Sequence, residues 1–118
     1  MHAYTVCAHT RAREAVNTGG DGVLERELER KLRDEIRKAG GECLKWVSPG
    51  YTGVPDRIVL ASGGRICFVE MKAPGKTERP RQRIVQQHLR EMGFTVFSSV
   101  DSADKIRDVI EWVEGGDA

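Results

Sequence analysis

The sequence of 118 residues predicts a single α/β domain in which a mixed central sheet is flanked by helices, with an extra helix at the C-terminal end. Two observations indicate this class. Apolar residues recur every three or four positions in three segments, which is the period of an amphipathic helix. Short runs rich in β-branched residues lie between these segments, as expected of strands. The order along the chain is helix, three strands, helix, strand, helix, without an internal repeat.

The first helix is expected over 24–39, and Gly40-Gly41 ends it. Its apolar stripe consists of Leu24, Leu28, Leu32, Ile36 and Ala39. A strand is expected over 42–47. A loop rich in Pro and Gly then leads to Asp56.

The next two strands form a predicted hairpin. They cover Arg57–Ala61 and 66–69, and Ser62-Gly63-Gly64 between them can adopt the positive φ of a tight turn. Their continuous apolar runs indicate burial on both faces, as in central strands covered by helices.

The last three elements are a helix, a strand and a helix. Pro80 opens a helix that is expected to stop at Gly93. Its predicted buried face consists of Ile84, Val85, His88, Leu89 and Met92. A strand over 94–100 follows, and then Asp101 or Ser102 caps the final amphipathic helix.

Composition and charge exclude several classes of protein. The net charge is +1, with 39% apolar and 31% charged residues, so a globular domain is expected and nucleic-acid binding would need local clusters of cations. We expect residues 1–20 to be a poorly ordered extension, 21–114 the domain and 115–118 a frayed tail. The sequence has no membrane-spanning run, signal peptide, paired cysteine motif or GxxxxGK[ST] loop. These absences predict a cytoplasmic protein without a nucleotide cofactor.

Charged residues lie at the open end of the predicted hairpin. Folding about its turn puts Asp56 opposite Glu70 or its neighbour, with Cβ atoms ~5 Å apart. Glu70 and Lys72 point the same way because strand side chains alternate. Adjacent carboxylates repel unless a cation lies between them, and their hard oxygen atoms suit Mg²⁺ or Mn²⁺. The predicted site would support phosphodiester hydrolysis, and the alternative is a surface salt bridge of Lys72.

The first helix offers an acid to the same site. At roughly 100° per residue, Glu25 falls inside the apolar stripe, Glu29 on its edge and Glu27 toward solvent. An acid in a core-facing stripe is costly unless it is paired or binds something. Either Glu25 or Glu29 is therefore a candidate metal ligand.

A basic segment follows the hairpin over residues 76–83. It contains Lys76, Arg79, Arg81 and Arg83 against Glu78 alone, and we predict that it binds phosphate groups of nucleic acid. Lys45 is a further candidate, or it lies at a sheet edge. Gln82 can face back toward the site from the first turn of its helix, and Tyr51 is a candidate base or sugar contact. A solvated charged loop is the alternative for this segment.

These residues also resemble a known family. The pattern consists of Gly40-Gly41, Lys45, Ser48-Pro49-Gly50, Gly53-Val54-Pro55-Asp56-Arg57, Phe68-Val69-Glu70-Met71-Lys72-Ala73-Pro74-Gly75, Gln82 and Gly93-Phe94. Asp56 with Glu70-x-Lys72 resembles the PD-(D/E)xK nucleases. The wider text, over about residues 24–113, resembles the virus-type replication-repair nuclease (VRR-NUC) domain.

The resemblance implies a restriction-endonuclease-like αβββαβ core. It implies that Asp56, Glu70 and the Met71 carbonyl bind Mg²⁺ or Mn²⁺, that Lys72 is the catalytic lysine and that Gln82 is a motif residue. Both Glu25 and Glu29 match acid or amide positions of the pattern. Stand-alone members of this type are phage or bacterial proteins that are often homodimeric and are similar in action to Holliday-junction resolvases. The resemblance therefore implies a homodimer that cuts branched DNA such as Holliday junctions or flaps.

Two other functions stay open at this stage. A catalytically silent DNA-binding module could use segment 76–83, although adjacent acids do not suit a protein that only binds phosphate. A sequence-specific restriction-type endonuclease is the other, although the chain is short for a separate target-reading domain.

Overall fold

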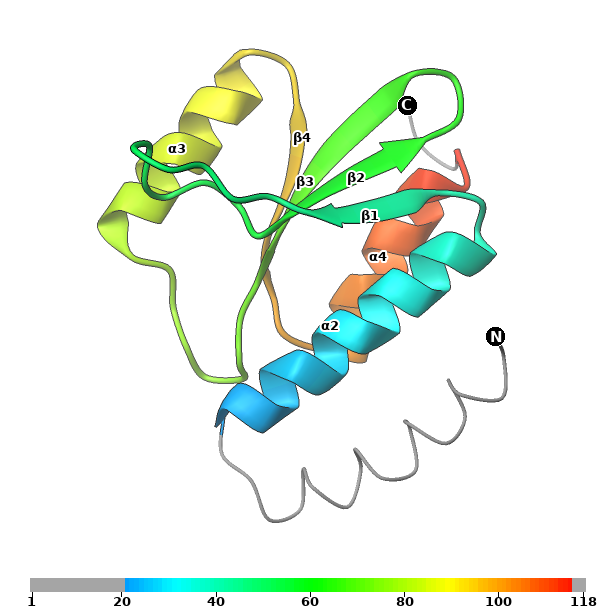
Figure 1. The fold of residues 1–118 in the computed structure, drawn as a ribbon, viewed down its shortest axis with the longest axis horizontal. Coiled ribbons are helices and arrows are strands. Elements are labelled where there is room, and N and C mark those ends of the chain that lie inside the picture. Colours follow the sequence, from blue (N-terminus) through cyan, green and yellow to red (C-terminus); the bar gives the residue numbers. More distant parts are fainter. Residues whose placement is uncertain (1–20, 116–118) are drawn as a thin grey trace.

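The computed structural model describes residues 21–115, so the extension predicted for 1–20 and most of the predicted tail lie outside the described range. Helices and strands follow one another in the predicted order (Figure 1). The elements are α2 (Asp21–Lys38), β1 (Glu42–Lys45), β2 (Arg57–Ala61), β3 (Arg65–Met71), α3 (Pro80–Glu91), β4 (Thr95–Val100) and α4 (Ala103–Val113). No helix among these is long and apolar enough to cross a bilayer.

The four strands form one sheet in the order β1-β2-β3-β4. β1, β2 and β3 pair antiparallel, and β4 pairs parallel with β3. The connection between these parallel strands runs through α3, because parallel neighbours need a crossover. The predicted α/β class with a mixed sheet is confirmed.

Helices cover both faces of the sheet, with α2 and α4 on one side and α3 on the other (Figure 1). The larger core lies under α2 and α4 and includes Ile36, Val59, Met71 and Val109. The smaller core lies under α3 and consists of Phe68, Val85, Leu89 and Val96. Since β3 contributes residues to both cores, its continuous apolar run reflects burial on both faces.

The β2–β3 hairpin turns where the sequence predicts. Gly63 and Gly64 adopt φ values of 80° and 75°, which other residues rarely adopt. Arg65 then donates to the carbonyl oxygens of Trp112 and Val113 at 2.7 and 2.9 Å. These bonds tie the end of α4 to the hairpin.

The predicted buried face of α3 is correct at Val85 and Leu89 but wrong at its other three positions. Ile84 is 59% exposed, and His88 and Met92 are also exposed. The buried residues of α3 are Val85, Gln86 and Leu89. Polar Gln86 lies inside because its side-chain oxygen accepts a hydrogen bond from the Ser98 hydroxyl, and apolar periodicity does not detect an inward-facing amide.

Several element boundaries also differ from the predicted ones, three of them by two residues or more. The first helix starts at Asp21 rather than 24, β1 ends at Lys45 rather than 47, and β3 runs on through Met71 rather than ending at 69. Backbone hydrogen bonds set these ends, whereas side-chain periodicity marks only the buried part of each element.

Candidate active site

Asp56 lies immediately before β2 and faces the end of β3. The β2–β3 register pairs Arg57 with Val69, so extending it by one residue puts Asp56 opposite Glu70. The Asp56 Oδ2 atom accepts a hydrogen bond from the Met71 backbone N–H at 2.9 Å. The carboxylate therefore sits against the strand that carries Glu70.

A bulge in β4 lies beside this point of β3. Val69 pairs with Phe97 and Met71 with Val100, so two steps in β3 match three in β4. Ser99 takes up the extra residue with φ of 50°, in the left-handed region that L-residues rarely adopt. Bulges of this kind bend a strand and redirect its side chains, and they are frequent near active sites.

Glu70 is almost completely enclosed, with 1% of its surface exposed. Its Oε2 atom accepts a hydrogen bond from Gln82 Nε2 at 2.9 Å and lies 3.2 Å from Lys72 Nζ. Its Oε1 atom is buried without a hydrogen-bond partner among the described residues. A buried carboxylate oxygen without a partner is costly, so this atom is suited to a ligand.

Gln82 connects Glu70 to Lys72 through both ends of its amide. While Nε2 donates to Glu70, Oε1 accepts from Lys72 Nζ at 3.0 Å and from the Arg79 backbone N–H at 2.9 Å. The bond from the Arg79 N–H satisfies a backbone donor at the start of α3. The first turn of α3 thus holds the lysine and the glutamate in one arrangement.

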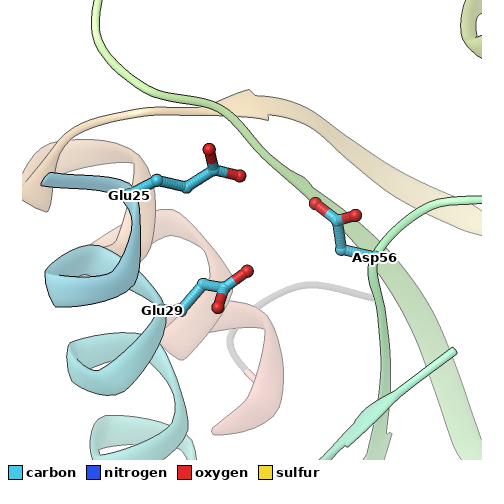
Figure 2. Close-up of side chains that lie close together, drawn as sticks. All are labelled: Glu25, Glu29 and Asp56. Atoms are coloured by element: carbon cyan, nitrogen blue, oxygen red, sulfur yellow. The ribbon is translucent and has the colours of Figure 1, made fainter. Parts of the chain in front are cut away.

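A second group of acids lies where α2 passes the start of β2. Glu25, Glu29 and Asp56 each offer an oxygen atom, and these atoms lie within 4.8 Å of one another. Figure 2 shows the two glutamates reaching from successive turns of α2 toward Asp56. Both helix acids predicted from the sequence therefore reach the site.

The two helix acids have different neighbours. Arg57 Nη2 lies 3.6 Å from Glu29 Oε1, and Arg57 is itself buried. Glu25 forms no ion pair with any described residue. The sequence pattern includes Arg57 only as the first residue of a strand, so its role beside the acids was not predicted. Its position directly after Asp56 was the available signal.

Burial and mutual repulsion raise the pKa of three of these carboxyl groups. Burial, then the Asp56 charge, raises the pKa of Glu70 to about 7. Burial is also the main cause of the raised pKa of Asp56, with Glu29 adding to it. For Glu25, burial and the Asp56 charge raise the pKa. A cation bound between these groups would offset both effects, because an opposite charge nearby favours the ionised carboxylate.

A hard divalent cation fits this set of donors. The three carboxylates of Glu25, Glu29 and Asp56 converge, and the unpartnered Glu70 Oε1 lies on the adjoining strand. Oxygen atoms of this kind are the ligands of Mg²⁺ and Mn²⁺. Asp56, Glu70, the Met71 carbonyl and one helix acid could hold such an ion.

The predicted DNA-binding cations lie outside this cluster. Lys76, Arg79, Arg81 and Arg83 are exposed along the segment before and within α3, and Lys45 is exposed at the end of β1. Arg81 Nε donates to the Thr52 carbonyl at 3.2 Å, and its guanidinium carbon lies 5.3 Å from the centre of the Tyr51 ring. Among the described residues, Lys45, Arg79, Arg81 and Arg83 form no ion pair with a carboxylate of the cluster.

Comparisons with known proteins identify the family to which the chain belongs. No family model matches the sequence. A protein of Acyrthosiphon pisum secondary endosymbiont phage 1, named "Putative nuclease p44", is 44% identical over 82 residues, which cover 70% of this chain and 87% of the phage protein. A solved structure described as a VRR_NUC domain superposes with a TM-score of 0.69 at 27% identity, covering 75% of this chain and 95% of that one. With this relative and this shared fold, the chain belongs to the VRR-NUC family.

Proposed function

We propose that this protein is a divalent-metal-dependent DNA nuclease that hydrolyses phosphodiester bonds. The observation that carries the proposal is the buried Glu70, whose one oxygen is held by Gln82 and Lys72 while the other has no partner. The name of the phage relative and the family fold support the same activity.

The chain's own residues would hold the ion between the hairpin and α2. We assign Asp56, Glu70 and the Met71 carbonyl as ligands. A bound Mg²⁺ or Mn²⁺ would lower the pKa of water and offset charge on the attacked phosphate. The Met71 N–H keeps the Asp56 carboxylate in place through its 2.9 Å hydrogen bond, so a ligand is oriented before any ion binds.

We assign Glu25 as the helix ligand in preference to Glu29. Arg57 already supplies a positive charge to Glu29 at 3.6 Å. Glu25 has a raised pKa and no ion pair among the described residues, so it gains more from a cation. Glu29 then acts as a positioning residue that orders Arg57 beside Asp56.

Lys72 is the proposed catalytic lysine. One hydrogen bond of its ammonium goes to Gln82 Oε1, and Glu70 Oε2 lies 3.2 Å away. An ammonium fixed in this way can stabilise the negative charge that develops on a phosphate oxygen. Gln82 positions Lys72 and does not need to touch the substrate.

We further propose that the substrate is branched DNA and that the protein acts as a homodimer in the cytoplasm of a bacterium, encoded by the bacterium or a phage. The exposed cations of segment 76–83 support phosphate binding beside the site. Symmetric cutting of a junction needs two sites, which a two-fold dimer supplies.

A cleavage panel tests the activity. Purified protein is incubated with Mn²⁺ and synthetic junctions, flaps, single strands and duplexes, alongside the variants Asp56→Asn, Lys72→Met and a matched exposed control, Lys38→Met. We expect cleavage by wild type and control and a loss of at least ~10²-fold in both site variants. Binding without cleavage across the whole panel would contradict the proposal and favour a silent DNA-binding module.

A further inference from the structure

A groove runs between the loop of residues 48–54 and α3, outside the cluster of carboxylates. Figure 1 shows this loop, between β1 and β2, beside α3. The groove consists of two hollows of about 370 and 670 Å³ that share Tyr51 and Arg81 in their walls. The smaller hollow also reaches Gln82, and the larger extends along α3 to His88 and Glu91.

The loop is held against α3 by Arg81. Its Nε atom donates to the Thr52 carbonyl, and its guanidinium lies over the Tyr51 ring. Gly53 allows this approach, because a Cβ atom there would lie 2.8 Å from Arg81 Cγ. Both walls of the groove are therefore defined by contacts within the chain.

The walls combine positive charge with an aromatic surface. Arg79, Arg81 and Arg83 form no ion pair with any residue of the described part. Tyr51 is 43% exposed, and Ile84 contributes an exposed apolar side chain. Proteins that bind single-stranded nucleic acid use this combination, with cations along the backbone and aromatic rings that stack on bases. At the far end, the negative charge of Glu91 does not favour phosphate.

The groove opens onto the proposed catalytic residues through Gln82. This residue lines the smaller hollow and also contacts Glu70 and Lys72. A DNA strand whose scissile phosphate lies at Lys72 could therefore continue past Gln82 into the groove. The larger hollow is in the size range of small-ligand pockets, roughly 300–1,000 Å³, which suits about one nucleotide and not the face of a duplex.

We propose that this groove binds an unpaired nucleotide strand, with a base stacked on Tyr51 and its phosphates on Arg79, Arg81 and Arg83. The inference rests on the proposed nuclease function and names the part of a branched substrate that it would recognise. It also accounts for the exposed Ile84 and His88 on α3, which line the larger hollow.

The test measures binding separately from cleavage. Fluorescence anisotropy with a labelled oligothymidylate and with a blunt duplex is carried out on the full chain carrying Asp56→Asn, without divalent metal. Into this background we introduce Tyr51→Ala, Tyr51→Phe, Arg83→Gln and the distant control Arg37→Gln.

We expect Tyr51→Ala to weaken oligothymidylate binding roughly 5- to 100-fold, with a smaller loss of affinity for the duplex. Tyr51→Phe should retain binding because it keeps the ring, and Arg83→Gln should weaken binding and reduce its salt dependence.

Three outcomes would overturn the groove proposal. The first is that Tyr51→Ala loses equal affinity for the single strand and the duplex, and the second is that neither Tyr51→Ala nor Arg83→Gln changes the affinity for DNA. The third is that Tyr51→Ala changes the oligomeric state and leaves DNA affinity unchanged, which would make this face a contact between copies of the chain. Because the background has no catalytic aspartate, failure here leaves the nuclease proposal standing. Conversely, if wild-type protein cleaves none of the DNA substrates in the panel above but still binds oligothymidylate through Tyr51, the nuclease proposal fails and the groove proposal stands.

Discussion

Arg57 Nη2 lies 3.6 Å from Glu29 Oε1, so the residue that follows Asp56 is paired with an acid of α2. The guanidinium is buried, with its Nε atom lacking a partner among the described residues. Among the described acids, Glu29 is thus the nearest to the positive charge of the buried Arg57 guanidinium. This ion pair makes Glu25 and Glu29 unequal, although they lie one helical turn apart on α2 and both approach Asp56.

The first prediction follows from that inequality. Glu25→Gln should weaken Mn²⁺ binding and reduce cleavage by more than ~100-fold, whereas Glu29→Gln should cost about 10-fold, as expected for a group that acts on a ligand's surroundings. Calorimetric titration with Mn²⁺ and single-turnover cleavage measure the two quantities. Larger losses in Glu29→Gln than in Glu25→Gln would show that the assignment is reversed.

Gln82 should affect the pH dependence of the reaction as well as its rate. Gln82→Glu places a second carboxylate beside buried Glu70 and removes the N–H donor to it, so the pKa of Glu70 should rise further. The acidic limb of kcat against pH should move to higher pH in Gln82→Glu than in Gln82→Ala. Both variants should lose roughly 10- to 100-fold in kcat, since Lys72 is no longer positioned. Identical pH profiles for the two variants would argue against the bridging role.

Stability of the metal-free protein should fall as pH rises through the site's pKa values. Burial raises the pKa of Glu70 from 4.5 to about 7, so between these values the folded state binds more protons than the unfolded one. The free energy of unfolding then decreases with rising pH in this window, by on the order of 3 kcal/mol for Glu70 alone.

Urea denaturation between pH 5 and pH 8, in the presence of chelator, measures this slope. Glu70→Gln has no charge to titrate, so its slope should be less negative than that of wild type. Added Mg²⁺ should raise wild-type stability mainly at the higher pH, where the ligands are ionised. A wild-type slope equal to that of Glu70→Gln is the outcome that excludes the raised pKa.

Two glycines of the loop of residues 48–54 provide a matched pair of variants. Gly53 and Gly50 both have positive φ, 91° and 81°, but a Cβ atom at Gly53 would meet Arg81 whereas Gly50 faces open space. Gly50→Ala should cost about 1 kcal/mol of stability through φ alone. Gly53→Ala should cost ~1–3 kcal/mol more through overpacking and should also reduce cleavage, because the loop leads to Asp56. Thermal denaturation and the cleavage assay test this, and equal melting temperatures would disprove the Arg81 contact.

The hairpin shows how much of this site could be predicted from sequence. Strand alternation and the Gly63-Gly64 turn set the β2–β3 register, and the register alone brings Asp56 opposite Glu70. The α2 stripe likewise predicted that Glu25 and Glu29 would face the sheet end. These inferences succeeded because they depend on local geometry with fixed periods.

Contacts between distant segments were harder to predict. Part of the inward face of α3 was misplaced, because Gln86 is an inward-facing amide whose partner, Ser98, comes from β4. The bulge at Ser99 had no glycine to signal its positive φ. The Arg57–Glu29 pair joins two elements whose distance the sequence does not encode. In each case tertiary partners, rather than local propensity, decide the outcome.

The two cores beneath the sheet are unequal in size, and this difference bears on motion. α2 and α4 share an extensive core with three strands, whereas α3 rests on a small group around Phe68 and Leu89. Local unfolding requires the least free energy where the fewest apolar contacts are lost, so we expect α3 to detach first. Detachment would withdraw Gln82 from Lys72 while Asp56 stays bonded to Met71. The helix that positions Lys72 is thus also the part of the site that we expect to detach from the sheet and return most readily.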